Sequence, residues 1–306
     1  MLDVRLLGTA GMQPLPSRRL SATLVRLGGR MILIDCGEGT QVGVHEAGWG
    51  WRGLSAILLT HMHADHTLGL PGLLLTLAHA EKGADEPLFV YGPEPLLPVL
   101  QALLLFAPRL PFPVRAVVLK GDETFAIEGV PGVEVSCTAL EHEVPCLAYA
   151  LTVSRAPRFD PEQARALGVP QPDWRRLQRG ESVDVAGRTI APEEVLGAPR
   201  RGVRLVLATD TRPTPALTPF VAGADLFIAD AMYGDEDGKP KRWEAQHMTF
   251  AESATIARDG GARRLWLTHF SPALSDPEAY LDRATDIFPA TTLGRDGLTT
   301  TLNFVD

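Results

Sequence analysis

The chain has 306 residues, with 29 Lys and Arg against 37 Asp and Glu, and its formal net charge of −8 excludes a uniformly basic nucleic-acid coat. Hydrophobic residues make up 45% and charged residues 22% of the sequence, which excludes a disordered or low-complexity chain. No apolar run approaches the ~20 residues that span a bilayer, and no signal-peptide pattern follows Met1, so we expect a cytoplasmic protein without membrane contact.

Short runs rich in Val, Ile and Leu alternate with helical stretches, which predicts an α/β or α+β fold. The first three predicted strands are Val4–Leu7, Ala22–Leu27 and Met31–Ile34. Gly28-Gly29 predicts a tight hairpin turn between the last two. A buried strand, Ser55–Leu59, precedes a His-rich loop and an apolar helix over about 68–80.

Strands of the second half end at polar residues. The predicted strands are Val203–Ala208, Leu226–Ala229 and Leu265–Leu267, and they are followed by Asp210, Asp230 and His269. Sheet proteins place their sites at the carboxyl ends of strands, so these residues are candidates. Thr249 and Glu252 predict a capping box for a helix that ends at Gly260-Gly261.

One segment differs in composition from the rest. Residues 151–204 are rich in Pro and Gly and hold ten Arg against seven acidic residues. We predict a single domain over 1–306 with an arm or insertion at about 153–200. Trp174, Arg175 and Arg176 stand on a proline-stiffened part of it and are candidate RNA contacts, although a solvated surface excursion has the same composition.

The most informative motif is Thr60-His61-Met62-His63-Ala64-Asp65-His66, directly after a buried strand. Three imidazoles and a carboxylate this close together are hard to satisfy in an apolar core. Zinc binds neutral His nitrogens and carboxylate oxygens, so the motif predicts a metal site. The alternative is a polar loop in which Asp65 caps a helix.

Two ions need further ligands, and His142, Asp210 and His269 each follow a predicted strand. We assign one ion to His61, His63 and His142. We assign the other to Asp65, His66 and His269, with Asp210 bridging both through its two oxygens. Each of the three additional residues, taken singly, could be a cap or a surface group.

At this point the chain resembles a known family. His-x-His-x-Asp-His after a strand is the signature of the metallo-β-lactamase superfamily, and further motifs resemble its ribonuclease Z family, which matures tRNA 3′ ends. The motifs that carry this resemblance are Leu7-Gly8-Thr9, Ile34-Asp35-Cys36-Gly37-Glu38-Gly39-Thr40-Gln41, Gly69-Leu70-Pro71-Gly72, Gly168-Val169-Pro170, Asp210-Thr211-Arg212-Pro213, His247-x-Thr249 and Leu267-Thr268-His269-Phe270-Ser271.

The resemblance implies a four-layer αββα sandwich of two mixed sheets with helices outside. It implies a phosphodiester hydrolase with two Zn²⁺ per subunit, which cuts precursor tRNA after the discriminator base and leaves a 3′-OH; Mn²⁺ accepts a similar ligand set. It also implies a homodimer whose arm grips the tRNA.

The resemblance also suggests roles for single residues. Asp65 is the candidate general base, and His247 is the candidate general acid, with Asp230 where the family has a glutamate that orients it. Because Asp is shorter than Glu, we expect that contact to run through water or another residue. Without the resemblance, His247 would be interpreted as a surface imidazole that caps a helix. Asp35 is expected either to accept the free N–H of a ligand His or to cap the Gly37 turn. Candidate phosphate contacts are Arg18, Arg19, Arg212 and Ser271, although each of them could be only a solvated surface group.

Some positions depart from the family pattern. Arg18-Arg19 stands where Arg-Asn is usual, and the family's His-Glu-Ala-Thr segment appears as Ile228-Ala229-Asp230-Ala231. These differences leave open a phosphodiesterase of the same fold that acts on a small cyclic or nucleotide substrate. A third hypothesis is a metal-stabilised nucleic-acid-binding protein without catalysis. The full set of seven predicted metal ligands argues against it, because binding alone does not require an open site for two ions.

Overall fold

The computed structural model describes residues 1–80, 82–237 and 246–305. The chain forms two compact units: Met1–Thr152 with Arg204–Asn303, and Val153–Val203 with the residues from Phe304 on. Among the described residues, no helix has the length and apolar character needed to cross a membrane.

The first unit contains two seven-stranded mixed sheets. The first sheet has the order β16-β1-β2-β3-β4-β5-β6. Its strands are β1 (Leu2–Gly8), β2 (Ala22–Leu27), β3 (Arg30–Ile34), β4 (Leu54–Leu58), β5 (Leu88–Gly92), β6 (Val114–Val118) and β16 (Thr299–Leu302). Pairing is antiparallel from β16 to β3 and parallel from β3 to β6. Gly28 and Gly29 both have positive φ, 53° and 88°, as the predicted tight turn between β2 and β3 requires.

The second sheet has the order β15-β14-β13-β12-β9-β8-β7. Its strands are β7 (Thr124–Ala126), β8 (Glu134–Leu140), β9 (Cys146–Arg155), β12 (Arg200–Ala208), β13 (Leu226–Asp230), β14 (Leu265–Thr268) and β15 (Thr291–Leu293). Strands β12 to β15 are parallel, so their carboxyl ends meet at one edge.

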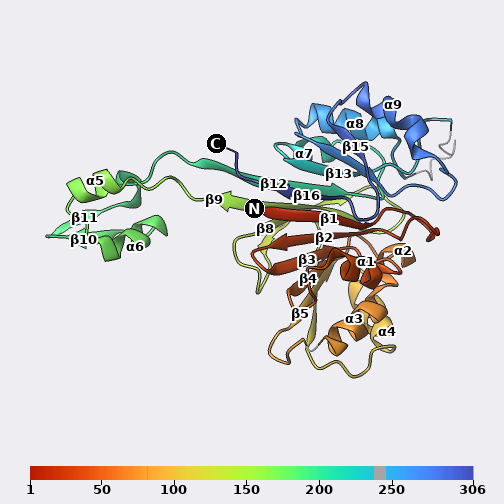
Figure 1. Ribbon diagram of the computed structural model, residues 1–306, viewed down its shortest axis with the longest axis horizontal. Coiled ribbons are helices and arrows are strands. Elements are labelled where there is room, and N and C mark those ends of the chain that lie inside the picture. Colours follow the sequence, from red (N-terminus) through yellow and green to blue (C-terminus); the bar gives the residue numbers. More distant parts are fainter. Residues whose placement is uncertain (81, 238–245, 306) are drawn as a thin grey trace. The chain divides into compact units, whose positions relative to one another are not determined.

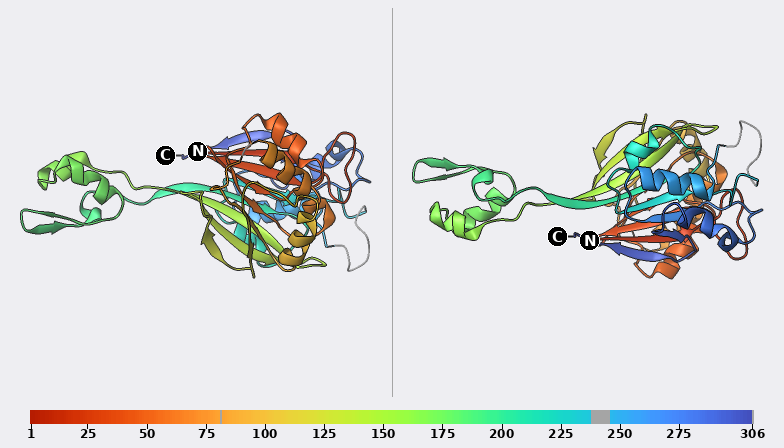
Figure 2. Two further views of the ribbon diagram at one scale, coloured as in Figure 1. Left: turned by 90° about the horizontal axis from the view of Figure 1, so that it is seen from below. Right: turned by 90° about the horizontal axis from the view of Figure 1, so that it is seen from above.

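Helices cover the outer face of each sheet (Figure 1 and Figure 2). The first sheet packs against α1 (Thr40–Ala47), α3 (Leu70–His79) and α4 (Leu96–Leu104), and the second against α7 (Leu217–Val221), α8 (Phe250–Asp259) and α9 (Leu281–Thr285). Two short helices, α2 (Ala64–Thr67) and η3 (Pro277–Tyr280), complete the unit. This is the predicted αββα sandwich.

The helix that follows His247 begins as predicted. The Thr249 hydroxyl accepts the Glu252 N–H, and the Glu252 carboxylate accepts the Thr249 N–H, so both halves of the capping box are present. Such a box satisfies two backbone donors that the first turn leaves open. It fixes the start of α8 directly beside His247.

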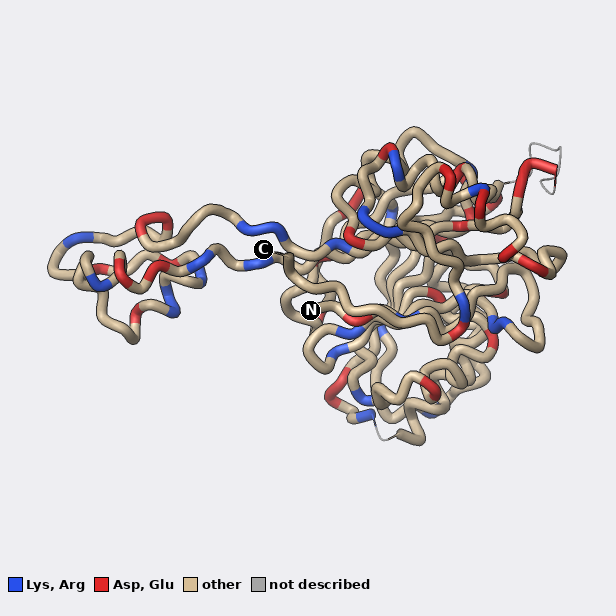
Figure 3. Tube along the Cα trace, turned by 45° about the horizontal axis from the view of Figure 1, so that its top comes forward, with Lys and Arg blue, Asp and Glu red and all other residues tan. Residues whose placement is uncertain are grey.

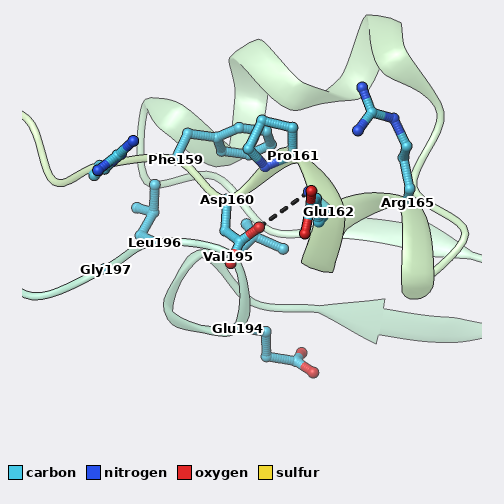
Figure 4. Close-up of a pocket in the computed structure, with 10 residues that line it drawn as sticks. Phe159, Asp160, Pro161, Glu162, Arg165, Glu194, Val195, Leu196 and Gly197 are labelled. Atoms are coloured by element: carbon cyan, nitrogen blue, oxygen red, sulfur yellow. Dashed lines mark hydrogen bonds between the residues drawn. The ribbon is translucent and has the colours of Figure 1, made fainter.

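The second unit has a small core of its own. It contains α5 (Pro161–Ala166), η1 (Gln171–Asp173), α6 (Trp174–Gln178), β10 (Val183–Val185), β11 (Arg188–Ile190) and η2 (Pro192–Glu194). Buried side chains from these elements and their loops pack together: Ala164, Val169, Leu177, Val183, Ile190 and Val195. The Asp160 carboxylate caps α5 by accepting the N–H groups of Glu162 and Gln163, and Figure 4 shows the first of these hydrogen bonds.

Candidate metal centre

The strand ends of the first unit bring the predicted ligands together. His61, His63, Asp65 and His66 follow β4, and the other ligands follow β8, β12 and β14. Parallel strands that end at one edge place the residues after them side by side. In the structure these side chains form overlapping groups whose ligand atoms lie within 4.8 Å of one another.

His61, His63 and His142 form one of these groups. The Nδ1 of His63 lies 3.2 Å from the Nε2 of His142. The Nε2 of His61 is buried and has no hydrogen-bond partner. Burial lowers the pKa of His61, so its imidazole is neutral and offers a lone pair.

Asp65, His66 and His269 form the second group. The Nε2 atoms of His66 and His269 are 3.2 Å apart. The Oδ2 of Asp65 lies 3.4 Å from the first of these nitrogens and 3.6 Å from the second. Three ligand atoms therefore face a common point.

Asp210 stands between the two groups. Its Oδ1 lies 3.8 Å from the Nε2 of His61 and 3.9 Å from that of His142. Its Oδ2 lies 3.3 Å from the Nε2 of His66 and 3.4 Å from that of His269. One oxygen thus faces each group, which is the arrangement that a bridging carboxylate needs.

The donor set fits divalent metal ions. Zn–N bonds of about 2.0–2.1 Å in a tetrahedron put ligand nitrogens roughly 3.3–3.4 Å apart, close to the 3.2 Å of both histidine pairs. The Oδ2 of Asp210 is buried without a hydrogen-bond partner, so a cation would also satisfy this oxygen. The cluster is a divalent-metal site.

The carboxylates of the centre are held ionised. Burial alone would raise the pKa of Asp65, but hydrogen bonds from His269 and His66 lower it well below its usual range. Burial also opposes ionisation of Asp210, yet the nearby His269, His66 and His61 lower the pKa of that carboxyl as well. Both side chains therefore present the anionic form that binds a metal.

Hydrogen bonds outside the ligand set orient the rings. The Oδ2 of Asp35 lies 2.9 Å from the Nδ1 of His66. The Oδ1 of Asp35 accepts the N–H of Thr60 at 2.8 Å, and the Thr60 hydroxyl lies 3.0 Å from the Nδ1 of His61. Asp35 thus makes the predicted contact with a ligand histidine and turns its Nε2 inward.

His247 lies next to the metal ligands and forms a hydrogen bond with Asp230. Its Nδ1 is 2.8 Å from the Oδ2 of Asp230, which is fully buried at the end of β13. Burial lowers the pKa of His247, but the Asp230 carboxylate outweighs this and raises it to about 9. The contact with Asp230 therefore orients the imidazole and favours its protonated form.

The expectation that this contact runs through water or another residue was wrong. The contact is direct because the segment before α8 runs alongside the segment after β13. The Tyr233 N–H donates to the Met248 carbonyl at 3.3 Å, and the Phe250 N–H donates to the Tyr233 carbonyl at 3.2 Å. This pairing brings the His247 ring to the shorter aspartate side chain.

The predicted phosphate contacts make hydrogen bonds within the protein. Arg18 donates to the Leu274 carbonyl at 2.8 Å, and Arg19 pairs with Glu46 at 2.8 Å. Arg212 forms an ion pair with Glu141. The Ser271 hydroxyl accepts the Ala273 N–H at 3.2 Å. Their contact with a phosphate stays a prediction.

A pocket of about 290 Å³ opens on the centre. Besides ligand residues and His247 it is lined by Met12, Glu143, Met232 and Tyr233, which sequence analysis missed. Three of them could have been found from their place in the sequence. Met232 and Tyr233 follow Asp230 at a strand end, and Glu143 follows His142. Met12 lies in the loop between β1 and β2, and no pattern in the sequence connects that loop to the metal motif.

The second unit carries the other predicted RNA contacts. The Trp174 ring is half-buried beside Phe159, and its indole N–H donates to the Val169 carbonyl at 3.1 Å. Arg175 and Arg176 are exposed, and Arg176 lies 3.5 Å from Asp173. Trp174 therefore contributes to packing within the unit, and its contact with RNA stays a prediction.

Two hollows lie within the second unit. One of about 610 Å³ is lined by side chains of both charges, Asp160, Glu162 and Arg165 among them (Figure 4). The other, of about 700 Å³, is lined by Arg155, Arg158, Arg200, Arg201 and Val305. Lys and Arg lie on both of the chain segments that lead into and out of this unit (Figure 3). The four arginines that line the second hollow concentrate positive charge there, although the chain as a whole is acidic.

Comparison with known proteins agrees with the geometry. A model of the metallo-β-lactamase superfamily matches residues 18–147. The chain is 42% identical to ribonuclease Z of Clostridium kluyveri over 304 residues, which cover 99% of each chain. The chain belongs to the ribonuclease Z family.

Other relatives of this family are similar to the chain over its length. Ribonuclease Z of Clostridium acetobutylicum is 42% identical, with 99% of each chain covered. The crystal structure of the short form of human tRNase Z superposes with a TM-score of 0.70 at 23% identity, covering 99% of this chain and 100% of that one. The resemblance drawn from the motifs is confirmed, and so is the fold.

Proposed function

We propose that the chain is a zinc-dependent endoribonuclease that cuts precursor tRNA after the discriminator base and leaves a 3′-OH. The observation that carries the proposal is 42% identity to ribonuclease Z over 99% of both chains, combined with the clustered His and Asp ligands. Similarity at this level over the whole length covers the second unit as well as the metal centre.

We assign two Zn²⁺ ions to the centre, with Mn²⁺ as an alternative metal. His61, His63 and His142 would hold one ion, and Asp65, His66 and His269 the other. Asp210 would bridge them, supported by the opposite orientation of its two oxygens. When bound, two such metal ions would lower the pKa of a water molecule and would stabilise the negative charge on the phosphate oxygens.

Two residues of the chain are placed to accept and donate protons during cleavage. Asp65 lines the pocket as an ionised carboxylate and is placed to accept a proton from the attacking water. His247 is protonated and lines the same pocket, so it is placed to donate a proton to the leaving 3′ oxygen. Asp230 is a positioning residue, since it holds the Nδ1 of His247 and leaves Nε2 for the substrate.

The same chemistry would cleave a small cyclic or nucleotide diester. The likeness to solved structures below 25% identity shows the fold alone, so it does not separate the two substrates. The curated sequence relatives favour precursor tRNA. Cleavage of a small diester without cleavage of precursor tRNA would favour the small-molecule substrate.

The second unit is proposed to bind the body of the tRNA. Its arginine-lined hollow, formed by Arg155, Arg158, Arg200 and Arg201, is suited to a phosphodiester backbone. Exposed Arg175 and Arg176 extend the basic surface. Salt-dependent binding of RNA is expected, despite the net charge of −8 of the chain.

We also infer that the protein is a cytoplasmic homodimer. Helix α4 has no charged residue, and Leu97, Leu105 and Phe106 on it or directly after it are 46%, 77% and 72% exposed. A surface helix that carries no charge and exposes large apolar side chains is typical of an interface. Sedimentation equilibrium should give twice the chain mass of 33.1 kDa, and a monomer at micromolar concentration would contradict this assembly.

The test of the function is cleavage of a precursor tRNA that carries a 3′ trailer, by zinc-loaded protein, with the product ends mapped. We expect one cut beside the discriminator base and a 3′-OH on the tRNA. Turnover of small diesters without cleavage of the precursor would move the substrate to the small-molecule class. The absence of turnover with both would leave a binding protein.

A further inference from the structure

The loop between β1 and β2 packs against the segment that carries His269. The Phe270 N–H donates to the Thr9 carbonyl at 2.9 Å, and the Gly11 N–H donates to the Phe270 carbonyl at 3.1 Å. Ala10 and Phe270 pair as a parallel bridge. The backbone of this loop is therefore held at a fixed distance from the His269 ring.

Gly11 has no room for a side chain. A Cβ on Gly11 would lie 2.7 Å from the Cε1 and 2.8 Å from the Nε2 of His269, and 2.8 Å from the Met232 methyl carbon. Contacts this short are not found for real Cβ atoms, so a neighbour would have to move. Gly11 lies outside the left-handed region, so its backbone would accept alanine, and the lack of space is what requires glycine.

His269 has little freedom to move away. The residue is fully buried and has a φ of 62°, and its ring stacks on that of His247 with centroids 5.4 Å apart. Its Nε2 faces the Oδ2 of Asp210 at 3.4 Å and that of Asp65 at 3.6 Å. A shift of the ring away from Gly11 would move this nitrogen out of the ligand cluster.

The next residue of the loop holds a second ligand of the same group. The Met12 N–H donates to the Oδ2 of Asp65 at 2.7 Å. Met12 has a φ of 65°, in the left-handed region that non-glycine residues rarely adopt. Two adjacent residues of one loop thus contact Asp65 and His269, and both of these ligands belong to the second group.

We propose that Gly11 is a positioning residue that sets the affinity of the second metal group, Asp65, His66 and His269, without acting on the first. The inference rests on the proposed pair of metal ions. Replacing groups that orient metal ligands typically weakens metal binding about 10–100-fold. Gly11→Ala should therefore bind one ion as the parent protein does and the other 10–100-fold more weakly.

The test is a titration of metal-free protein with Co²⁺, followed by visible absorption and by competition with a chelator. The parent protein should take up two equivalents. Gly11→Ala should show an unchanged spectrum and affinity for the first equivalent and a weakened second one. A merely structural role of Gly11 would not separate the two equivalents in this way.

Gly83→Ala is the matched control, because Gly83 also lies outside the left-handed region and its nearest neighbour to an added Cβ is 3.9 Å away. It should bind both equivalents like the parent. The inference would be overturned if Gly11→Ala bound both equivalents of Co²⁺ equally weakly, or if it bound both like the parent. Uptake of only one equivalent by the parent protein would overturn it as well. Cleavage of precursor tRNA by the parent is measured separately, so failure of the proposed substrate leaves the metal readout intact.

Discussion

His247→Ala should separate two kinds of diester substrate. The structure places a protonated imidazole, bonded to Asp230 at 2.8 Å, in the pocket that opens on the metal centre. A positioned general acid contributes about 10²–10⁴ in rate, which is about 2.7–5.4 kcal/mol of barrier. Cleavage of precursor tRNA should slow by this factor, because the ribose 3′ oxygen is a poor leaving group without a proton.

Hydrolysis of bis(p-nitrophenyl) phosphate should change less than about tenfold in the same variant, because a nitrophenolate leaves without general-acid help. Single-turnover rates on both substrates, with the metal content of each preparation measured, give the comparison. His45→Ala is the control, since His45 is an exposed imidazole on α1.

Two results would refute this reasoning. Equal losses on both substrates with full metal content would mean that His247 acts on the attacking side or on the phosphate. An unchanged rate with precursor tRNA would mean that the leaving oxygen takes its proton from another group.

Three further changes test other parts of the molecule. His63→Ala should abolish turnover of precursor tRNA and of the aryl diester alike, and a substantial residual rate in metal-depleted variant protein would contradict the metal mechanism. Replacement of residues 159–196 by a short Gly-Ser linker should abolish cleavage of precursor tRNA and leave the rate of hydrolysis of the aryl diester unchanged. A short linker suffices because the two ends already meet, where the Gly197 N–H donates to the Arg158 carbonyl at 2.8 Å. Equal loss on both substrates would make the second unit structural. Asp160→Ala should destabilise α5 by about 1 kcal/mol, seen as faster hydrogen exchange in the second unit, and unchanged protection there would contradict the capping role.

Much of the fold could be predicted because its signals are local. The Gly28-Gly29 turn and the Thr249 capping box depend on residues a few positions apart, and both are present. The metal ligands could be proposed because the motif from His61 to His66 is dense and because the other candidates follow strands. Parallel strands then bring such residues to one edge.

What could not be predicted depends on segments that meet only in three dimensions. The direct contact of His247 with Asp230 requires the pairing of Tyr233 with the segment before α8, which has no periodicity to announce it. The pairing of Arg212 with Glu141 joins two strand ends in the same way. The close approach of Gly11 to His269 depends on a loop whose path the sequence does not indicate.

The central claim is that two metal ions on this cluster drive cleavage of precursor tRNA. The most direct measurement is a titration of metal-free protein with Zn²⁺, in which the rate of cleavage at the discriminator base is recorded at each ratio of metal to chain. We expect no cleavage without metal and a rate that rises until two equivalents are bound. Full activity at one equivalent, or cleavage by metal-free protein, would contradict it.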